Sequence, residues 1–279
     1  MLVAARSPDA LRRHYLIERE LADRLRSAPD RLRRSLYPAV YDELLRRVPD
    51  HPQLRARFDP GELDRRSRAV DHQLAFLSPA FTPRTVFMEV GAGDCALAIR
   101  AAGYVERVYA IEVSESITGG VAAPCNFRLA LSDGVSIPVP EASVDVAFSN
   151  QLMEHLHPRD AAEQLANIHR ALAPGGVYFC ITPNRLYGPR DISATFDEVA
   201  TGLHLREYSA RELRRLFLDA GFSSVRFYAG ARGTYARIPF GMISLFEEFL
   251  ESLPYRMRKR LADNAPARAL LGLRVAAVK

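Results

Sequence analysis

The sequence has few cysteines, no tryptophan and almost no lysine. Its three cysteines, Cys95, Cys125 and Cys180, lie far apart and form neither a CxxC pair nor a zinc-type Cys/His cluster, which favours a reducing compartment. Lysine occurs only at positions 259 and 279, so arginine supplies nearly all of the positive charge. We interpret the arginine excess as a composition bias, because a nucleic-acid surface needs arginines gathered on one face.

Long apolar runs are also missing. No run approaches the roughly 20 residues that a membrane-spanning helix requires. Arg6, Asp9 and Arg12 precede any apolar stretch, so we expect no secretory signal peptide and predict a cytoplasmic protein without a membrane span. The chain has 279 residues, of which 48% are hydrophobic and 25% charged, with a formal net charge of +5. This length suits one large domain or a core with an appendage.

The first 80 residues differ from the rest in their pattern. Apolar side chains repeat at helical spacing in residues 11–25, 36–48 and 63–77. Prolines such as Pro38 are expected to interrupt these helices. We therefore predict a helical N-terminal appendage over residues 1–80, which caps a sheet. Covering a substrate site and forming a homodimer are the alternative roles.

From residue 81 to 279 the pattern alternates between strands and helices. Continuous apolar runs are found at residues 86–90, 108–113, 127–131, 144–149, 177–182, 225–229 and 273–278. Strands of this kind are buried on both faces, and helical spacing between them favours a parallel sheet covered by helices. Residues 235–265 show helical spacing before the last strand. We interpret that segment as a helical insert that forms a lid or a partner surface.

One stretch is the most informative. The predicted strand from Thr85 to Val90 is followed at once by Gly91-Ala92-Gly93 and then by a helix of small residues. Glycines allow a sharp bend and the close approach of a ligand, and the free amides of a helix start point toward it. Glu112 ends the next strand 19 residues after Gly93, where a carboxylate can bind ribose hydroxyls. An adenosine ligand is therefore expected, although a plain turn and a surface glutamate are alternatives.

Several blocks in a fixed order identify a family resemblance. They are Glu89-Val90-Gly91-Ala92-Gly93, Ile111-Glu112, Asp133 with Ser143–Val146, Asn150–Leu156, Ala171–Gly176 and Ala220–Phe222. In this order the sequence resembles the class I S-adenosylmethionine-dependent methyltransferases, of the small-molecule type found in ubiquinone and menaquinone biosynthesis. It departs from many members at Cys95, where they have a third glycine.

The resemblance implies a Rossmann-like, seven-stranded, mostly parallel sheet with helices on both faces. It also implies S-adenosyl-L-methionine as the cofactor, with a site formed by Glu89, Gly91, Gly93, Glu112, Asp133, Gly134 and Asn150. In this assignment Glu89 supports the methionine ammonium group, Glu112 binds the ribose and Asp133 faces the adenine. Asn150 lies next to the sulfonium, and Gly134 lies beside Asp133.

Methyl transfer needs mainly the alignment of its two partners. The predicted acceptor is a small molecule, methylated on an oxygen of a sugar, a quinone or another metabolite. A hydroxyl acceptor must lose its proton, for which histidine is the usual agent. His155, His157 and His204 are the candidates, of which His155 and His204 are assigned to catalysis, although a packing role is the alternative for each. Asn184, Arg185 and Tyr187 are further candidates for the acceptor pocket. No metal-ligand spacing is recognisable, so no metal is expected.

Other functions use parts of the same pattern. An NAD(P)-dependent oxidoreductase could share the glycine turn and Glu112, and Tyr255 and Lys259 have the spacing of a short-chain dehydrogenase pair. Their position in a late basic helix favours chance. A binding protein without activity is a second alternative. A nucleic-acid methyltransferase is disfavoured, because the chain has no Asn/Asp-Pro-Pro-aromatic motif after the fourth strand and no paired catalytic cysteine.

Overall fold

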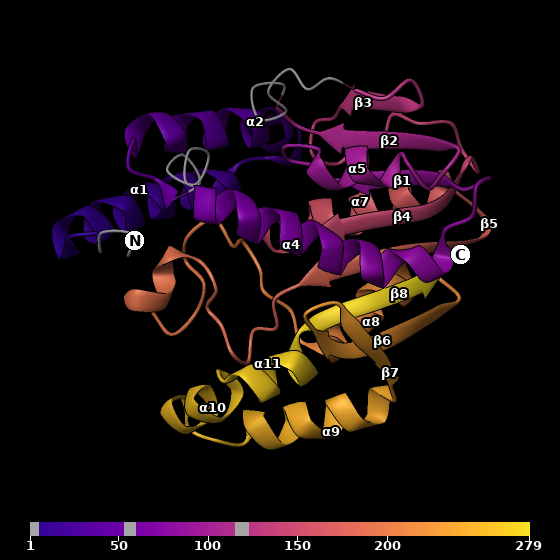
Figure 1. Ribbon diagram of the computed structural model, residues 1–279. Coiled ribbons are helices and arrows are strands. Elements are labelled where there is room, and N and C mark those ends of the chain that lie inside the picture. Colours follow the sequence, from indigo (N-terminus) through magenta and orange to yellow (C-terminus); the bar gives the residue numbers. More distant parts are fainter. Residues whose placement is uncertain (1–5, 53–59, 115–122) are drawn as a thin grey trace.

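A single sheet forms the centre of the computed structural model, which describes residues 6–52, 60–114 and 123–279 (Figure 1). Within these residues the sheet has eight strands in the order β3-β2-β1-β4-β5-β8-β6-β7. The strands are β1 (Val86–Val90), β2 (Arg107–Glu112), β3 (Phe127–Leu131), β4 (Val144–Asn150), β5 (Leu172–Thr182), β6 (Ser224–Ala231), β7 (Thr234–Ile238) and β8 (Leu273–Val278). Strands β3, β2, β1, β4 and β5 are parallel, while β8 runs antiparallel to both β5 and β6.

The prediction of seven strands is wrong by one. The additional strand is β7, which pairs antiparallel with β6 through a tight turn at Arg232 and Gly233. Both turn residues have positive φ, 53° and 82°, as a two-residue hairpin turn requires. The helical prediction for residues 235–265 is therefore wrong at its start. A strand of five residues beside a helix carries too short an apolar alternation to be separated from helical spacing.

Helices lie on both faces of the sheet and at its carboxyl edge (Figure 1). They are α1 (Pro8–Ser27), α2 (Asp30–Arg47), α4 (Pro60–Leu77), α5 (Ala96–Ala101), α7 (Pro158–Ala171), α8 (Ala210–Asp219), α9 (Phe240–Glu251), α10 (Tyr255–Ala262) and α11 (Ala265–Leu271). Pro38 lies inside α2, so the predicted interruption there is wrong. Its neighbours Tyr37 and Val40 are buried, and their packing outweighs the lost hydrogen bond.

Each face of the sheet is covered by its own cluster of buried apolar side chains. On one face α4 and α5 pack over Phe87, while on the other α7 and α8 pack over Tyr178. The second cluster also contains side chains of α1 and α2, such as Leu21 and Val40, which are fully buried. Burying one such side chain is worth about 1.5–3 kcal/mol. The N-terminal helices are thus fixed to the sheet by the same core that holds the sheet together.

Strand β5 is longer than predicted. It begins at Leu172 rather than at residue 177, with a register shift against β4 between Val144 and Val146.

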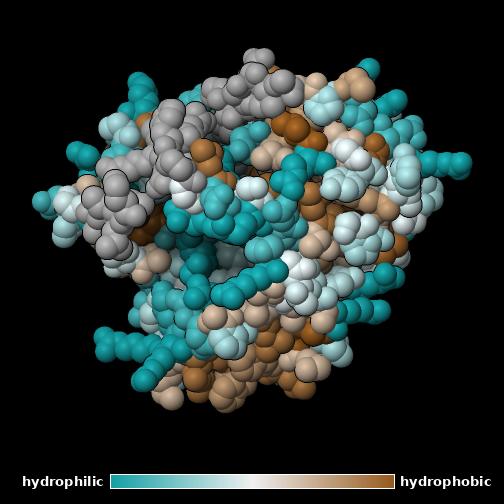
Figure 2. Space-filling model, viewed as in Figure 1, coloured by the Kyte–Doolittle hydropathy of each residue, from teal (hydrophilic) through white to brown (hydrophobic). Residues whose placement is uncertain are grey.

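Outside the core, apolar side chains gather over α9 at the lower edge of the molecule (Figure 2). No helix among the described residues combines the length and the apolar character needed to cross a bilayer.

Candidate active site

The glycine turn connects β1 to α5 at the carboxyl edge of the sheet. Gly91 and Gly93 have φ values of +74° and +55°, a region in which a side chain is strained. A Cβ atom at Gly93 would meet no heavy atom within 4 Å, whereas one at Gly91 would lie 3.1 Å from Cδ1 of Leu152, so the turn is open at Gly93 and covered by Leu152 at Gly91. Cys95, at the N-cap of α5, also has a left-handed conformation with φ 60°. This explains why a third glycine fits that position.

Glu112 joins the ends of the first two strands. Its Oε2 accepts a hydrogen bond from the amide of Gly93 at 2.7 Å, and its Oε1 accepts one from the amide of Val113 at 2.7 Å. The amides of Gly91 and Ala92 donate to the carbonyl of Ile111. The carboxylate predicted to bind ribose is therefore buried against the glycine turn itself.

Glu89 is a buried carboxyl group beside the same turn. Burial raises its pKa well above the usual range, an effect that the amide of Ala98 partly opposes. Its Oε2 has no hydrogen-bond partner among the described residues. A buried carboxyl oxygen of this kind is costly unless a donor or a cation reaches it. The site therefore fits a ligand that carries an ammonium group.

Asp133 and Gly134 follow β3 and face different surroundings. Oδ1 of Asp133 accepts the amides of Ser136 and Val135 at 2.7 and 3.0 Å. Burial raises the pKa of Asp133, but these bonds outweigh it and place the pKa below its ordinary value. Gly134 has φ +86°, and a Cβ there would lie 2.9 Å from Cδ2 of Tyr37. Gly134 therefore packs beneath the Tyr37 ring of α2.

Asn150 is the last residue of β4, half-buried at the same edge of the sheet as the glycine turn. The parallel register places β4 next to β1, with Glu89 opposite Phe148. Asn150 and Glu89 therefore lie on neighbouring strands. The seven residues assigned to the cofactor lie along the ends of four neighbouring strands and the loops that follow them.

The two predicted catalytic histidines lie together, although 49 positions separate them in sequence. Their rings are 4.8 Å apart between centroids, in an edge-to-face arrangement. Nδ1 of His155 bonds to the carbonyl of Leu203 at 3.1 Å and is therefore the protonated nitrogen. Nδ1 of His204 bonds to Oε1 of Glu207 at 2.7 Å. In each ring Nε2 is the nitrogen left to accept a proton.

The surroundings move the pKa values of the two imidazoles apart. Burial, helped by the nearby His204, lowers the pKa of His155 to about 3, so that ring stays neutral. Burial also lowers the pKa of His204, but the hydrogen bond and charge of Glu207 and the charge of Glu154 outweigh it and raise the value. His204 is therefore the stronger base. Glu207 is not among the predicted site residues, although its spacing of three residues from His204 was visible in the sequence.

A second carboxyl group that was not predicted as a site residue is Glu154. It is fully buried next to His155, and its Oε2 accepts a hydrogen bond from Oγ1 of Thr182 at 2.8 Å. Its Oε1 has no partner among the residues described. Burial raises the pKa of Glu154 to about 7. This group can hold a proton at neutral pH, unlike an exposed glutamate.

The N-terminal helices reach this histidine cluster directly. Oε2 of Glu18, in α1, accepts the amide of Leu203 at 3.3 Å. Arg26, also in α1, donates to the carbonyls of Gly202 and His204 at 3.1 and 3.3 Å. The Tyr41 ring of α2 lies 6.0 Å from the His155 ring. Helices α1 and α2 thus contact the histidine cluster and the loop that carries His204, which no local pattern in the sequence could indicate.

The three further candidates for the acceptor pocket point elsewhere. Nδ2 of Asn184 donates to Glu247 at 2.5 Å and to the carbonyl of Leu271 at 3.1 Å. Arg185 forms ion pairs with Glu212 and Glu251. Tyr187 is buried in an apolar cluster with side chains of α9, α10 and α11. These residues hold the loop after β5 to the C-terminal helices.

Among the residues that the structure describes, two groups of side chains have the composition of metal ligands. They are His14, Glu18 and His51, and Glu154, His155 and His204, in each of which the polar atoms lie within 4.8 Å of one another. In the first group His14 already bonds to Arg6 and Glu18, each at 2.7 Å. Both ring nitrogens of His14 are thus engaged, so we assign no metal there. The expectation of a metal-free site stays a prediction.

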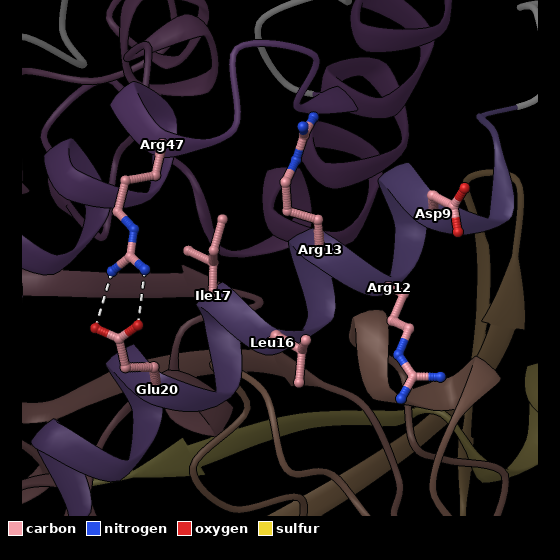
Figure 3. A pocket seen from close by; sticks show the side chains of 7 residues that line it. All are labelled: Asp9, Arg12, Arg13, Leu16, Ile17, Glu20 and Arg47. Atoms are coloured by element: carbon pink, nitrogen blue, oxygen red, sulfur yellow. Dashed lines mark hydrogen bonds and ion pairs between the residues drawn. The ribbon is translucent and has the colours of Figure 1, made fainter.

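A separate hollow lies on the outer side of α1, with a volume of about 340 Å³ (Figure 3). Most of its walls are charged side chains of α1, and Arg47 of α2 closes it by an ion pair with Glu20 (Figure 3). It contains none of the residues assigned to the cofactor or to catalysis. We therefore locate the site at the sheet edge and not in this hollow.

Comparison with known proteins identifies relatives. A family described as "Methyltransferase domain" matches residues 63–226, which is more than half of the chain. A Mycolicibacterium smegmatis protein named a probable S-adenosylmethionine-dependent methyltransferase is 34% identical over 137 residues, covering 48% of this chain and 51% of the relative. A Mycobacterium tuberculosis protein of the same name is 32% identical over 157 residues, 55% of each chain. The chain thus spans about half the length of these relatives.

Solved structures agree on the fold. A chain of the complex that contains the Haloferax volcanii Trm112 methyltransferase activator superposes with a TM-score of 0.56 at 17% identity, covering 82% of this chain and 96% of that one. An S-adenosylmethionine-dependent methyltransferase of Mesorhizobium loti gives 0.51 at 16% identity, with 75% and 98% covered. The predicted α/β class and the resemblance to the class I S-adenosylmethionine-dependent methyltransferases are confirmed, whereas the quinone-biosynthesis type stays a prediction. The chain belongs to the methyltransferase-domain family.

Proposed function

We propose that the protein is an S-adenosyl-L-methionine-dependent methyltransferase. The observation that carries this proposal is the buried Oε2 of Glu89, which has no hydrogen-bond partner within the described part of the chain and lies beside a turn that is open at Gly93. An ammonium group placed there would satisfy the oxygen and lower the pKa of the carboxyl group. The methionine part of the cofactor carries such a group next to a carboxylate. Family membership and the names of the relatives support the same function.

Each residue of the proposed site has a separate task. Gly91 and Gly93 let the ligand lie against the backbone, and the Glu112 carboxylate, held by the Gly93 amide, faces the ribose hydroxyls. Asp133 accepts hydrogen bonds from the adenine amino group, and Asn150 borders the sulfur. Gly134 does not contact the cofactor in this proposal; it lets the loop that carries Asp133 pack closely against the Tyr37 ring. When bound, S-adenosyl-L-methionine supplies a methyl group on a positively charged sulfur.

The acceptor in this proposal is the hydroxyl oxygen of a small molecule, such as a sugar, a quinone or another metabolite. His204 accepts the hydroxyl proton at Nε2, while Glu207 holds Nδ1 and stabilises the imidazolium that forms. His155 stays neutral and packs against the His204 ring. Glu154 lies close enough to influence the charge of His204. This division of labour follows the separation of the two pKa values.

We further propose that residues 1–80 act as a cover for a core formed by residues 81–279. The contacts from Glu18, Arg26 and Tyr41 to the histidine cluster support this role. A site enclosed by two helices favours a small acceptor over a folded nucleic acid. It also limits the access of water to the transferred methyl group.

Calorimetric titration tests the cofactor assignment. We expect binding of S-adenosyl-L-methionine and of S-adenosylhomocysteine, and no binding of NAD⁺ or NADP⁺. Glu112→Gln keeps one oxygen for the Gly93 amide, removes the charge that faces the ribose, and places its NH2 group against the Val113 amide. Hydrogen bonds to a charged group are worth about 1.5–3 kcal/mol, so affinity should fall roughly 10- to 100-fold.

Glu106→Gln is the matched control, because this exposed glutamate lies on the approach to the same strand. It should leave the affinity unchanged. Binding of a nicotinamide dinucleotide alone would contradict the proposed function. Equal affinities for the wild type and Glu112→Gln would contradict the role of Glu112 but not the family. A labelled-methyl assay with hydroxylated acceptors then tests turnover.

A further inference from the structure

Helix α9 carries apolar side chains both on the face that packs against the protein and on the face that is exposed to solvent. Its inner face carries Ile243 and Leu250, which are buried, and Glu247, which binds Asn184 and the amide of Ala210. This face fixes the helix to the rest of the protein. The outer face carries Met242, Leu245 and Phe249 at a spacing of three and four residues, and these side chains are 58%, 68% and 54% exposed. An amphipathic surface helix normally has polar residues there.

The neighbouring helix α10 carries two further exposed apolar side chains. Met257 and Leu261 lie one turn apart on that helix and are both exposed. Helix α10 packs directly against α9. Together these five side chains define the α9–α10 surface: Met242, Leu245, Phe249, Met257 and Leu261. Figure 2 shows apolar side chains gathered over α9 at the lower edge, with extended hydrophilic side chains beside them at the α10 end.

The charge next to this surface is positive. Helix α10 reads Tyr-Arg-Met-Arg-Lys-Arg-Leu-Ala and contains no acidic residue. No carboxylate of the described part of the chain forms an ion pair with Arg256 or Arg260, which are exposed on α10. The acidic residues on α9 are already engaged, since Glu248 pairs with Arg211 and Glu251 with Arg185. The basic side chains are therefore available to an external anion.

We propose that the α9–α10 surface binds peripherally to an anionic lipid bilayer. Exposed apolar stripes on a helix with flanking arginines and lysines lie in the interface between headgroups and acyl chains. Here the stripe of α9 enters that boundary while the cations of α10 contact lipid phosphates. A symmetric dimer through this surface would place two basic α10 helices in one interface without free carboxylates, which disfavours a second copy.

Sedimentation of the full chain with vesicles tests the proposal. We expect it to sediment with vesicles of phosphatidylcholine and phosphatidylglycerol, and much less with phosphatidylcholine alone. Raising the salt concentration should release it, because the attraction of cations to the surface is screened. Equal binding to both vesicle types would overturn the role of the cations. No binding to either type would overturn the proposal as a whole.

Two variants separate the apolar from the charged contribution. Leu245→Asp with Phe249→Asp should abolish sedimentation with anionic vesicles. Arg256→Gln with Arg260→Gln should weaken it about 25-fold, since each cation near an anionic surface contributes about fivefold. The altered side chains are exposed, so circular dichroism and the thermal midpoint should stay as in the wild type.

The matched controls lie on other parts of the molecule. Leu63→Asp changes an exposed leucine of α4, and Arg128→Gln with Arg226→Gln removes two exposed arginines of β3 and β6. Neither should alter vesicle binding. If the control variants lost as much vesicle binding as the variants of α9 and α10, binding would not be specific to the α9–α10 surface, which would contradict the proposal. A dimer in sedimentation equilibrium that Leu245→Asp dissociates, together with no vesicle binding, would assign the surface to a second copy instead.

Discussion

Arg33 of α2 and Asp160 of α7 form a buried ion pair that joins the N-terminal helices to a helix packed on the sheet. Nε of Arg33 lies 2.5 Å from Oδ2 of Asp160, and its Nη2 lies 3.0 Å from Oδ1. The hydroxyl of Tyr37 donates to the same carboxylate at 2.7 Å. Both charged side chains are almost completely buried. The two residues are 127 positions apart in sequence, so this contact depends on the tertiary fold.

Removing one charge of this pair should destabilise the fold. In Asp160→Asn the Arg33 guanidinium stays buried without its main counter-charge, which costs about 3–5 kcal/mol. Urea unfolding measures this as a lower midpoint. Asp64→Asn is the control, because it breaks an exposed pair with Arg68 and should cost less than about 1 kcal/mol. Equal decreases in the free energy of unfolding in the two variants would show that the buried pair contributes no more to stability than the exposed pair.

Gly134 and Gly175 form a matched pair for the contact with Tyr37. Both have positive φ, +86° and +78°, but only at Gly134 would a Cβ collide with a neighbour, the Tyr37 ring. Gly175→Ala should cost about 1–2 kcal/mol for the left-handed backbone alone. Gly134→Ala should cost about 1–3 kcal/mol more, because the ring must shift. Equal free energies of unfolding for both variants would contradict the packing of Tyr37 on this loop.

Glu154 should make stability depend on pH. Its pKa is about 7 in the folded protein and about 4.3 in an unfolded chain, so the fold favours the neutral carboxyl group. The resulting stabilisation is complete below about pH 4.3 and is lost as the pH rises through 7. Relative to Glu154→Gln, the wild type should lose on the order of 3 kcal/mol across this range.

The difference between the two unfolding curves isolates Glu154 from His155 and His51. Burial lowers the pKa of both histidines, so they act in the opposite direction, losing stability as the pH falls below about 6.5. Glu106→Gln, an exposed change, should follow the wild-type pH profile. A Glu154→Gln curve parallel to the wild type would show that Glu154 titrates normally.

The Glu207–His204 contact should be visible in the titration of the imidazole. Glu207→Gln removes the charge that raises the pKa of His204, so the ring should titrate at a lower pH than in the wild type. Nuclear magnetic resonance of the ring carbon protons measures this directly. Glu198→Gln changes an exposed residue of the same loop and should leave the His204 titration unchanged. An unaltered pKa in Glu207→Gln would remove the reason for choosing His204 as the base.

Local patterns in the sequence determined most of the elements. A capping box formed by Ser209 and Glu212, a pattern visible in the sequence, marks the start of α8. Strand β8 has the predicted bounds, Leu273–Val278. The turn at Gly91 and Gly93 also forms as its two glycines require. Such features depend on capping, on periodicity and on backbone freedom within a few residues, so they can be read along the chain.

Only the tertiary structure decided which distant residues meet. Strand β7 exists because β6 offers it an edge, and Asn184 turns toward Glu247 because α9 packs behind its loop. The pairing of His155 with His204, and the reach of Glu18 to their loop, result from the packing of α1 against the sheet edge. Burial then sets the pKa values of these groups. Contacts between residues far apart in sequence leave no periodic trace, since their energy depends on the assembled core.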